Sequence, residues 1–369
     1  MHEVLRALID RDRTVDQEMW GSFWDRLRDG ALRSGETVAL LSSLSTRMPD
    51  GETLVAMLRS LDERRPDVAA RSDGTARPAG TARAEGTARP DGTANIVGTG
   101  GGPATFNIST AAAFVAAALG VRVVKTGSRA YTSTCGSHDL LDRLGIATTT
   151  SYEQTDDLLE RFGIAFPGNF VYPREVALLA RSIVPMDLRM IGGFVNSVGP
   201  FLAAVPVRAQ IVGVSDRSLL PALGQVAATV TDRRIWLCSN ELGVDELVDS
   251  VDNVVLTNDG TDAISLWAAA PETGAGAGTD AIAGLRPAGA GEDVVDHFLG
   301  VLSGERTGPA TRTVRLNAAA LAVASGLIAE WPEAIRAADD ALRSGAARDL
   351  VDRLRARPAR RAVAAARAR

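Results

Sequence analysis

Hydrophobic positions recur at helical spacing through the first 65 residues. Leu5, Leu8 and Ile9 form one group, the run from Trp20 to Leu27 forms a second, and further groups follow at 39–44 and 54–61. Apolar residues three or four positions apart line one face of an α-helix. The pattern predicts a small helical domain over residues 1–65.

The character of the chain changes at residue 66. Residues 66–94 contain four copies of Gly-Thr-Ala, which start at positions 74, 80, 86 and 92 and lie among prolines and charged residues. Such repeats lack the large apolar side chains that a stacked solenoid needs. Their composition is typical of a disordered surface loop.

From residue 95 onward, short β-rich runs alternate with helical segments. This alternation is typical of a mostly parallel sheet flanked by helices, so the sequence predicts an α/β domain over 95–352. A helical insertion near 174–190 is assigned to the small domain, and 353–369 is an arginine- and alanine-rich tail. The expected strands are 95–97, 121–124, 210–214, 235–238 and 254–256; the expected helices include 110–119, 138–144, 317–330 and 332–342.

Composition excludes several classes of protein. The net charge of −5 argues against a nucleic-acid partner. No apolar run reaches the roughly 20 residues that cross a bilayer, and the first residues lack the apolar stretch of a signal peptide. Two cysteines and three histidines are too few for a disulfide framework or a multi-histidine metal site. The expected location is the cytoplasm.

Lys125 is the only lysine among 40 basic residues. It follows the predicted strand 121–124, in the segment Lys125-Thr126-Gly127-Ser128-Arg129. Parallel sheets place ligand contacts at the carboxyl ends of their strands. A compact ammonium group there suits a phosphate or pyrophosphate, where arginine is not equivalent.

A glycine-rich segment, 98–110, lies between a predicted strand and a predicted helix. Its glycines allow backbone N–H groups to approach an anion, and the helix N-terminus adds partial positive charge. Ser109 and Thr110 are candidates for helix capping and for hydrogen bonds to phosphate. A plain strand-to-helix turn explains the same glycines equally well.

Two further segments carry polar groups. Residues 132–137 place hydroxyls before a helix, and Gly243-Val244-Asp245-Glu246 places adjacent carboxylates on a loop that we expect at the surface. Carboxylate oxygens are suitable ligands for Mg²⁺, which commonly bridges to substrate phosphates. A capped helix start is the alternative for each segment.

Taken together, these segments resemble the anthranilate phosphoribosyltransferase family, whose scaffold is shared with pyrimidine nucleoside phosphorylases. The matching motifs run in order along most of the chain. They are Gly35-Glu36-Thr37, Ile96 to Gly101, Thr105 to Thr110, Lys125-x-Gly127-x-Arg129, Gly136-Ser137, Asp139-Leu140-Leu141, Asn196-x-x-Gly199-Pro200, Gly243-x-Asp245-Glu246 and Leu316 to Ala319.

The resemblance implies phosphoribosyl pyrophosphate as donor, Mg²⁺ as cofactor, a cleft between the two domains and a homodimer formed through the N-terminal helices. Ser109, Asp245 and Glu246 would hold the metal, and Lys125 with the carboxylate pair would act in catalysis. The implied donor- and phosphate-binding residues are Gly98, Thr99, Gly100, Gly101, Asn107, Ser109, Thr110, Lys125, Ser133 and Ser137.

The acceptor side departs from the family pattern. Thr126 and Ser128 replace a histidine and an asparagine, and Met186 stands at the position that an ungapped count assigns to a carboxylate-binding arginine. Arg189 and Asn196 remain as acceptor-site candidates, with Arg181 nearby. The sequence therefore predicts an aromatic or heterocyclic acceptor other than anthranilate.

The glycine loop departs as well, because Gly102 stands where the family has an aspartate and the loop is one residue shorter. Two alternatives therefore stay open. One is a nucleoside phosphorylase, which would use orthophosphate without metal; the other is a degenerate homologue without activity.

We expect that deletion of most of the Gly-Thr-Ala repeats leaves the melting temperature and donor binding nearly unchanged, because the repeats offer little apolar surface to bury. Thermal melts and calorimetric titration of the shortened protein measure both quantities. Loss of folding on deletion would show that the segment packs.

Overall fold

The computed structural model describes residues 1–33, 35–65, 92–129, 135–259, 264–266, 282–289 and 293–357, with backbone alone at 189–190 and 264–266. Most of the predicted repeat loop 66–94 and residues 358–369 of the tail lie outside this part. The predicted division into domains, 1–65 with 174–190 against 95–352, remains a prediction.

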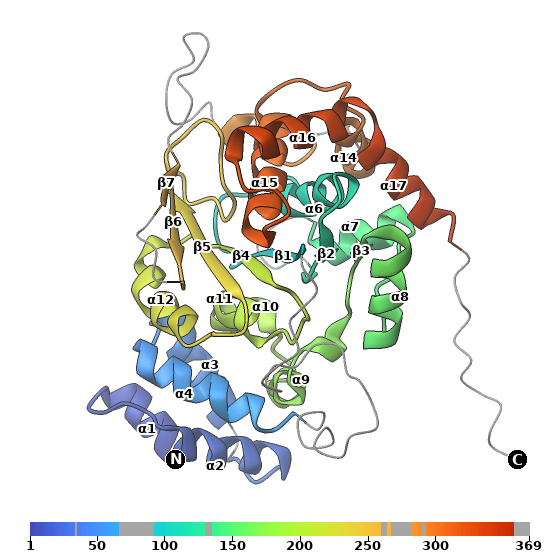
Figure 1. The fold of residues 1–369 in the computed structure, drawn as a ribbon. Helices are drawn as coiled ribbons and strands as arrows, with labels where there is room; N and C mark the ends of the chain where they lie inside the picture. The colour runs from blue at the N-terminus through green and yellow to red at the C-terminus, as the bar shows by residue number, and fades with distance from the viewer. Residues whose placement is uncertain are drawn as a thin grey trace, which may run out of the picture.

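Within the described residues, four helices precede the sheet, as the spacing of apolar residues predicted. They are α1 (Glu3–Asp10), α2 (Gln17–Arg28), α3 (Glu36–Thr46) and α4 (Gly51–Asp62). Asp16 and Asp50 accept hydrogen bonds at the N-termini of α2 and α4, which satisfies amides that have no partner within the helix. In Figure 1 these blue helices lie below the sheet, next to α9 (Arg174–Ser182).

The sheet has seven strands in the order β3-β2-β1-β4-β5-β6-β7. The first five strands in this order pair in parallel, whereas β6 and β7 join antiparallel at one edge. The predicted α/β class with a mostly parallel sheet is confirmed. The strands are β1 (Thr93–Gly98), β2 (Arg122–Val124), β3 (Ile164–Ala165), β4 (Ala209–Gly213), β5 (Arg234–Asn240), β6 (Asn253–Thr257) and β7 (Ile264–Leu266).

Helices cover both faces of the sheet (Figure 1). On the upper face as drawn lie α6 (Ile108–Ala118), α14 (Val294–Leu302), α15 (Pro309–Ser325), α16 (Trp331–Arg343) and α17 (Ala346–Arg355). The remaining helices are α7 (Ser137–Leu144), α8 (Tyr152–Phe162), α10 (Leu188–Ile191), α11 (Gly193–Leu202) and α12 (Leu220–Ala228), with short 3₁₀ turns at Asn169–Val171 and Arg217–Leu219. None of the helices in the described part is long and apolar enough to cross a membrane.

Two predicted boundaries are wrong. The fourth repeat, Gly92-Thr93-Ala94, was assigned to the loop, but it is buried and its Thr93 begins β1, so the loop ends earlier. The helix predicted over 317–330 is α15, which starts at Pro309 and ends before Gly326, whose φ of +79° is left-handed. Glycine tolerates this conformation and terminates helices for that reason.

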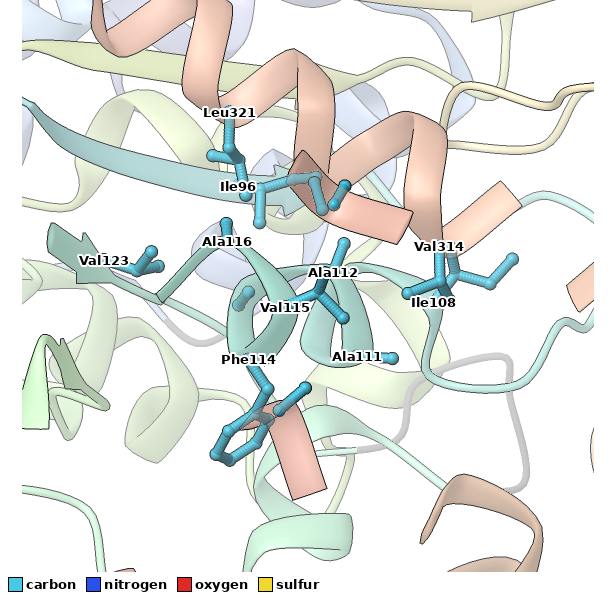
Figure 2. Packing of buried hydrophobic residues seen from close by; sticks show 14 of the residues in the cluster. Ile96, Ile108, Ala111, Ala112, Phe114, Val115, Ala116, Val123, Val314 and Leu321 are labelled. Carbon is cyan, nitrogen blue, oxygen red and sulfur yellow. The ribbon is translucent and has the colours of Figure 1, made fainter. Parts of the chain in front are cut away.

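The core beside the site depends on small residues in α6. Ala111, Ala112 and Ala116 are fully buried, and they allow α15 and strand β1 to approach α6 closely. Figure 2 shows Ile96 of β1 and Leu321 of α15 beside these alanines. Because α6 is buried almost all round, its N-terminus has a fixed position at the end of β1.

The opposite face of the sheet shares one core with the N-terminal helices. Trp20, Phe23 and Leu54 belong to the same buried cluster as Val212 and Leu237 of the central strands. The helical segment is therefore anchored to the sheet through apolar contacts.

Candidate active site

A cavity of about 710 Å³ lies where the glycine loop, Lys125, helices α7, α9 and α11 and the Asp245-Glu246 loop meet. Twelve of the predicted site residues line it. They are Gly98, Thr99, Gly100, Gly101, Asn107, Ser109, Lys125, Ser128, Ser137, Asn196, Asp245 and Glu246.

The glycine loop leaves β1 and turns sharply around Ser215. Gly100 and Gly101 have φ of +66° and +84°, which favours glycine at both positions. Asp245 accepts a hydrogen bond of 2.8 Å from the Gly100 N–H, and Ser215 donates one of 2.5 Å to the Gly100 carbonyl. The backbone N–H and the carbonyl of Gly100 are therefore both held by hydrogen bonds.

The structure gives a steric reason for Gly102. A Cβ at this position would lie 2.2 Å from the carbonyl oxygen of Gly243. The shortened loop thus packs directly against the loop that carries the carboxylates, and no side chain fits between them.

Helix α6 begins at the same end of the sheet. The N-cap residue, Asn107, uses its side chain to donate to the Cys135 carbonyl at 3.1 Å, and the backbone of Ser109 lies near enough to the Glu246 carboxylate to oppose the rise in its pKa. The predicted phosphate contact through the Thr110 side chain is wrong for this geometry. Thr110 is fully buried, does not line the cavity, and its hydroxyl has no hydrogen-bond partner.

Glu246 is buried and Asp245 half-buried, in contrast to the predicted surface loop. Glu246 is only 8% exposed, and its Oε2 has no hydrogen-bond partner. Burial raises the pKa of Glu246 well above its usual value, and the negative charge of Asp245 raises it further. The pKa of Asp245 is also raised by burial. The two side chains hydrogen bond to each other, as expected for a carboxyl–carboxylate pair that shares a proton.

Two asparagines fix the loop that carries this pair. Asn240, at the end of β5, donates to the carbonyls of Val244 and Glu246 and accepts from the Val244 N–H. Asn317 of α15 exchanges hydrogen bonds with the backbone of Leu247. These buried contacts replace regular secondary structure and set the direction of both carboxylates.

Lys125 lies beside the carboxylates and is 3% exposed. Burial lowers its pKa to about 8, although Glu246 and Asp245 act in the opposite direction. Its ammonium group donates to the Thr126 carbonyl at 2.7 Å, which leaves further donors for a ligand.

The oxygen donors present are suitable for Mg²⁺. Glu246 offers a buried oxygen without a partner, and Asp245 and Ser109 lie next to it. The part of the chain that the structure describes contains no cluster of three or more acidic, histidine or cysteine ligands. A magnesium ion here would therefore need oxygens from water or substrate phosphates, as is usual for this metal.

Two predicted acceptor residues lie outside the cavity. The Thr126 side chain points into the protein, where it hydrogen bonds to Asn95, and it is 1% exposed. Met186 does not line the cavity either. Ser133 and the side chain of Arg189 lie outside the described residues.

The cavity also includes residues that the motifs did not identify. Arg181 of α9 lines it, as does Tyr172, which hydrogen bonds to the Thr126 side chain and whose pKa burial raises to about 12. His138 of α7 lines it too. Burial lowers the pKa of His138, and the positive charges of Lys125 and Arg129 lower it further. The ungapped count between Tyr172 and Asn196 assigned the arginine position to Met186 and not to Arg181. This count crosses the break between α9 and α10, where a shift in alignment is easily missed.

Replacement of Glu246 by glutamine should change how stability depends on pH in metal-free buffer. An unfolded glutamate ionises above about pH 4.5, whereas the folded protein retains the proton because its pKa is raised. The parent therefore loses stability as pH rises, and the glutamine variant lacks this loss. We expect the melting temperature of Glu246→Gln, relative to the parent, to increase between pH 5 and 8. The matched control is Glu153→Gln, because Glu153 is exposed. A melting-temperature difference between Glu246→Gln and the parent that does not change with pH would contradict the raised pKa.

Comparison with known proteins agrees with this geometry. Residues 91–348 match the family model described as glycosyl transferase family, a/b domain. Anthranilate phosphoribosyltransferase from Myxococcus xanthus is 34% identical over 261 residues, which cover 69% of this chain and 74% of that protein. The Cenarchaeum symbiosum enzyme is 30% identical over 326 residues, 88% of each chain.

Solved structures show the same fold. The Thermus thermophilus anthranilate phosphoribosyltransferase superposes with a TM-score of 0.73 at 27% identity, covering 96% of this chain and 99% of that one. The Saccharomyces cerevisiae enzyme in complex with PRPP and Mg gives 0.68 at 19% identity, covering 92% and 91%. This chain belongs to the anthranilate phosphoribosyltransferase family of pentosyltransferases.

Proposed function

We propose that the protein transfers 5-phosphoribose from phosphoribosyl pyrophosphate to an aromatic or heterocyclic acceptor, with Mg²⁺ as cofactor. One observation carries the proposal: the buried Glu246 and Lys125 and the half-buried Asp245 lie together against a glycine loop in a single cavity. Burial of adjacent carboxyl groups opposes folding, so their presence in the cavity favours a functional role over a structural one. A relative in the same fold class is named as a complex with PRPP and Mg.

The residues fit the charge changes of this reaction. When the bond between ribose C1 and pyrophosphate breaks, positive charge develops on the sugar and negative charge on the leaving group. Lys125 and the N–H groups of the glycine loop would stabilise the pyrophosphate. Bound magnesium would supply further positive charge, held by Asp245, Glu246 and Ser109.

The two alternatives fit the cavity less well. A nucleoside phosphorylase that used orthophosphate alone would gain nothing from a buried acidic pair, because carboxylates repel phosphate when no metal lies between them. An inactive homologue would have no need for Lys125 in a buried position that lowers its pKa to about 8.

The acceptor site is revised by the geometry. Since Thr126 and Met186 do not line the cavity, the argument against anthranilate depends on Ser128 alone. Arg181 adds a cation to the cavity wall, and a guanidinium binds carboxylates in a bidentate manner. We therefore propose a planar acceptor that carries an acidic group, and anthranilate belongs in the panel of compounds to be tested.

The direct test incubates the protein with Mg²⁺, phosphoribosyl pyrophosphate and a panel of aromatic acids and bases, and measures pyrophosphate release. Release with an aromatic acid, and none with chelator, is the expected result. Nucleoside cleavage by orthophosphate without metal would favour the phosphorylase.

The variant Asp245→Asn/Glu246→Gln should bind phosphoribosyl pyrophosphate without dependence on magnesium. Its amides keep the shape of the parent side chains but lose the charge that holds the metal. Calorimetric titration of the donor with and without Mg²⁺ measures the effect, and circular dichroism checks the fold. Magnesium-dependent binding equal to that of the parent would remove the pair from the metal site.

Replacement of Arg181 by alanine should raise the KM of an acidic acceptor about tenfold or more, because a hydrogen bond to a charged group is lost. The KM of the donor should stay the same. Arg174→Ala is the matched control, since Arg174 is exposed on the same helix and does not line the cavity. Equal effects of both variants would contradict a role for Arg181 in the acceptor site.

A further inference from the structure

Ser215 lies just beyond β4, outside the cavity lining, yet it hydrogen bonds to Thr99 and Gly100 and lies close to Gly101 and Gly102. Its N–H donates to the Thr99 hydroxyl at 3.3 Å, and its own hydroxyl donates to the Gly100 carbonyl at 2.5 Å. A Cβ at Gly101 would lie 3.7 Å from Ser215 Oγ, and one at Gly102 would lie 3.1 Å from Ser215 Cβ. The backbone and the side chain of Ser215 therefore lie against the glycine loop.

The loop has other supports, which are weaker or would be shared with the ligand. The Thr99 hydroxyl lies 3.5 Å from the Gly100 carbonyl, a longer contact than the 2.5 Å bond from Ser215. Thr99 continues the β1–β4 ladder through a bond of 2.9 Å from its N–H to the Gly213 carbonyl. Asp245 holds the Gly100 N–H, but Asp245 is also a proposed metal ligand, and the same N–H is a donor that pyrophosphate would use. The bond from Ser215 lies on the carbonyl side of Gly100, so donor binding does not compete for it.

Gly100 is a residue whose conformation needs such a support. Its φ of +66° is accessible to glycine at low cost, but glycine also adopts many other conformations. With only the long contact from the Thr99 hydroxyl at its carbonyl, the peptide groups around Gly100 could rotate, and their N–H groups would no longer point at the anion. A hydrogen bond to the carbonyl reduces this freedom before the ligand arrives.

We propose that Ser215 is a positioning residue of the donor site, which keeps the backbone N–H groups of the glycine loop directed at pyrophosphate. The inference rests on the proposed function for the identity of the ligand. Loss of the hydroxyl should weaken binding of pyrophosphate and of phosphoribosyl pyrophosphate while leaving the acceptor site unchanged.

The test compares three variants. Ser215→Ala removes the hydroxyl, and Ser215→Thr restores it. Ser325→Ala is the matched control, because Ser325 also donates to a backbone carbonyl in a buried position, at the end of α15. That end lies far from the site, since the neighbouring Leu327 contacts Gly92 at the start of β1.

Calorimetry with inorganic pyrophosphate and with phosphoribosyl pyrophosphate, both with Mg²⁺, should give a Kd about five- to tenfold higher for Ser215→Ala. The threonine variant should recover part of this loss, and Ser325→Ala should bind like the parent. The KM of the donor should rise while the KM of the acceptor stays the same.

Hydrogen exchange provides a second readout that needs no ligand. In Ser215→Ala, exchange should accelerate in peptides that cover 99–102 and remain unchanged in α6. Parent-like Kd and parent-like exchange in the loop would overturn the proposal, as would acceleration spread evenly over the protein. If the parent itself binds neither pyrophosphate nor the donor, the proposed function fails, and exchange in the loop alone decides the role of Ser215.

Discussion

The half-buried Asp245 and the buried Glu246 lie side by side next to the glycine loop, and much of the structure around the cavity follows from this. Burial raises both pKa values, and the charge of Asp245 raises that of Glu246 further; this opposes folding at neutral pH. Lys125 reduces this cost, but the same burial lowers its own pKa to about 8. In the proposed function, a divalent cation would relieve the two carboxyl groups, and the pyrophosphate bound with it would pair with Lys125.

This arrangement is possible because the loop that carries the carboxylates lies very close to the backbone of β1 and β4. A Cβ at Gly213 of β4 would lie 1.6 Å from the carbonyl oxygen of Asp245, and one at Gly98 of β1 would lie 1.9 Å from its carboxylate. Glycine is required at both positions because the carboxylate loop passes directly over the ends of the strands. Asn240 and Asn317 then hold that loop by its backbone, which leaves the acidic side chains free to face the cavity.

The fold could be predicted from the sequence because its signals are local. Helical spacing in 1–65 and alternating β and α segments after 95 depend on neighbouring residues, and the glycine loop with Lys125 lies at strand ends where a parallel sheet gathers its ligands. The contacts that correct the prediction are not local. Thr126 is adjacent to Lys125, but successive residues of an extended segment point in opposite directions, and Thr126 therefore faces Asn95 in the core. No spacing rule indicates that a loop with an Asp-Glu pair is buried, since this depends on Asn317, some 70 residues away.

The departure at Gly102 shows how one substitution is connected to the rest of the site. With a side chain at 102, the loop could not approach Gly243 as closely as it does here, where the Gly100 N–H also donates to Asp245. The loss of a carboxylate from the glycine loop is thus accompanied by contact with a carboxylate from the neighbouring loop. The carboxyl group nearest the loop is that of Asp245, whose own loop is anchored through β5 and α15. The geometry at Gly102 is therefore compatible with the metal–pyrophosphate site that we propose, although the loop motif alone suggested that a ligand was missing.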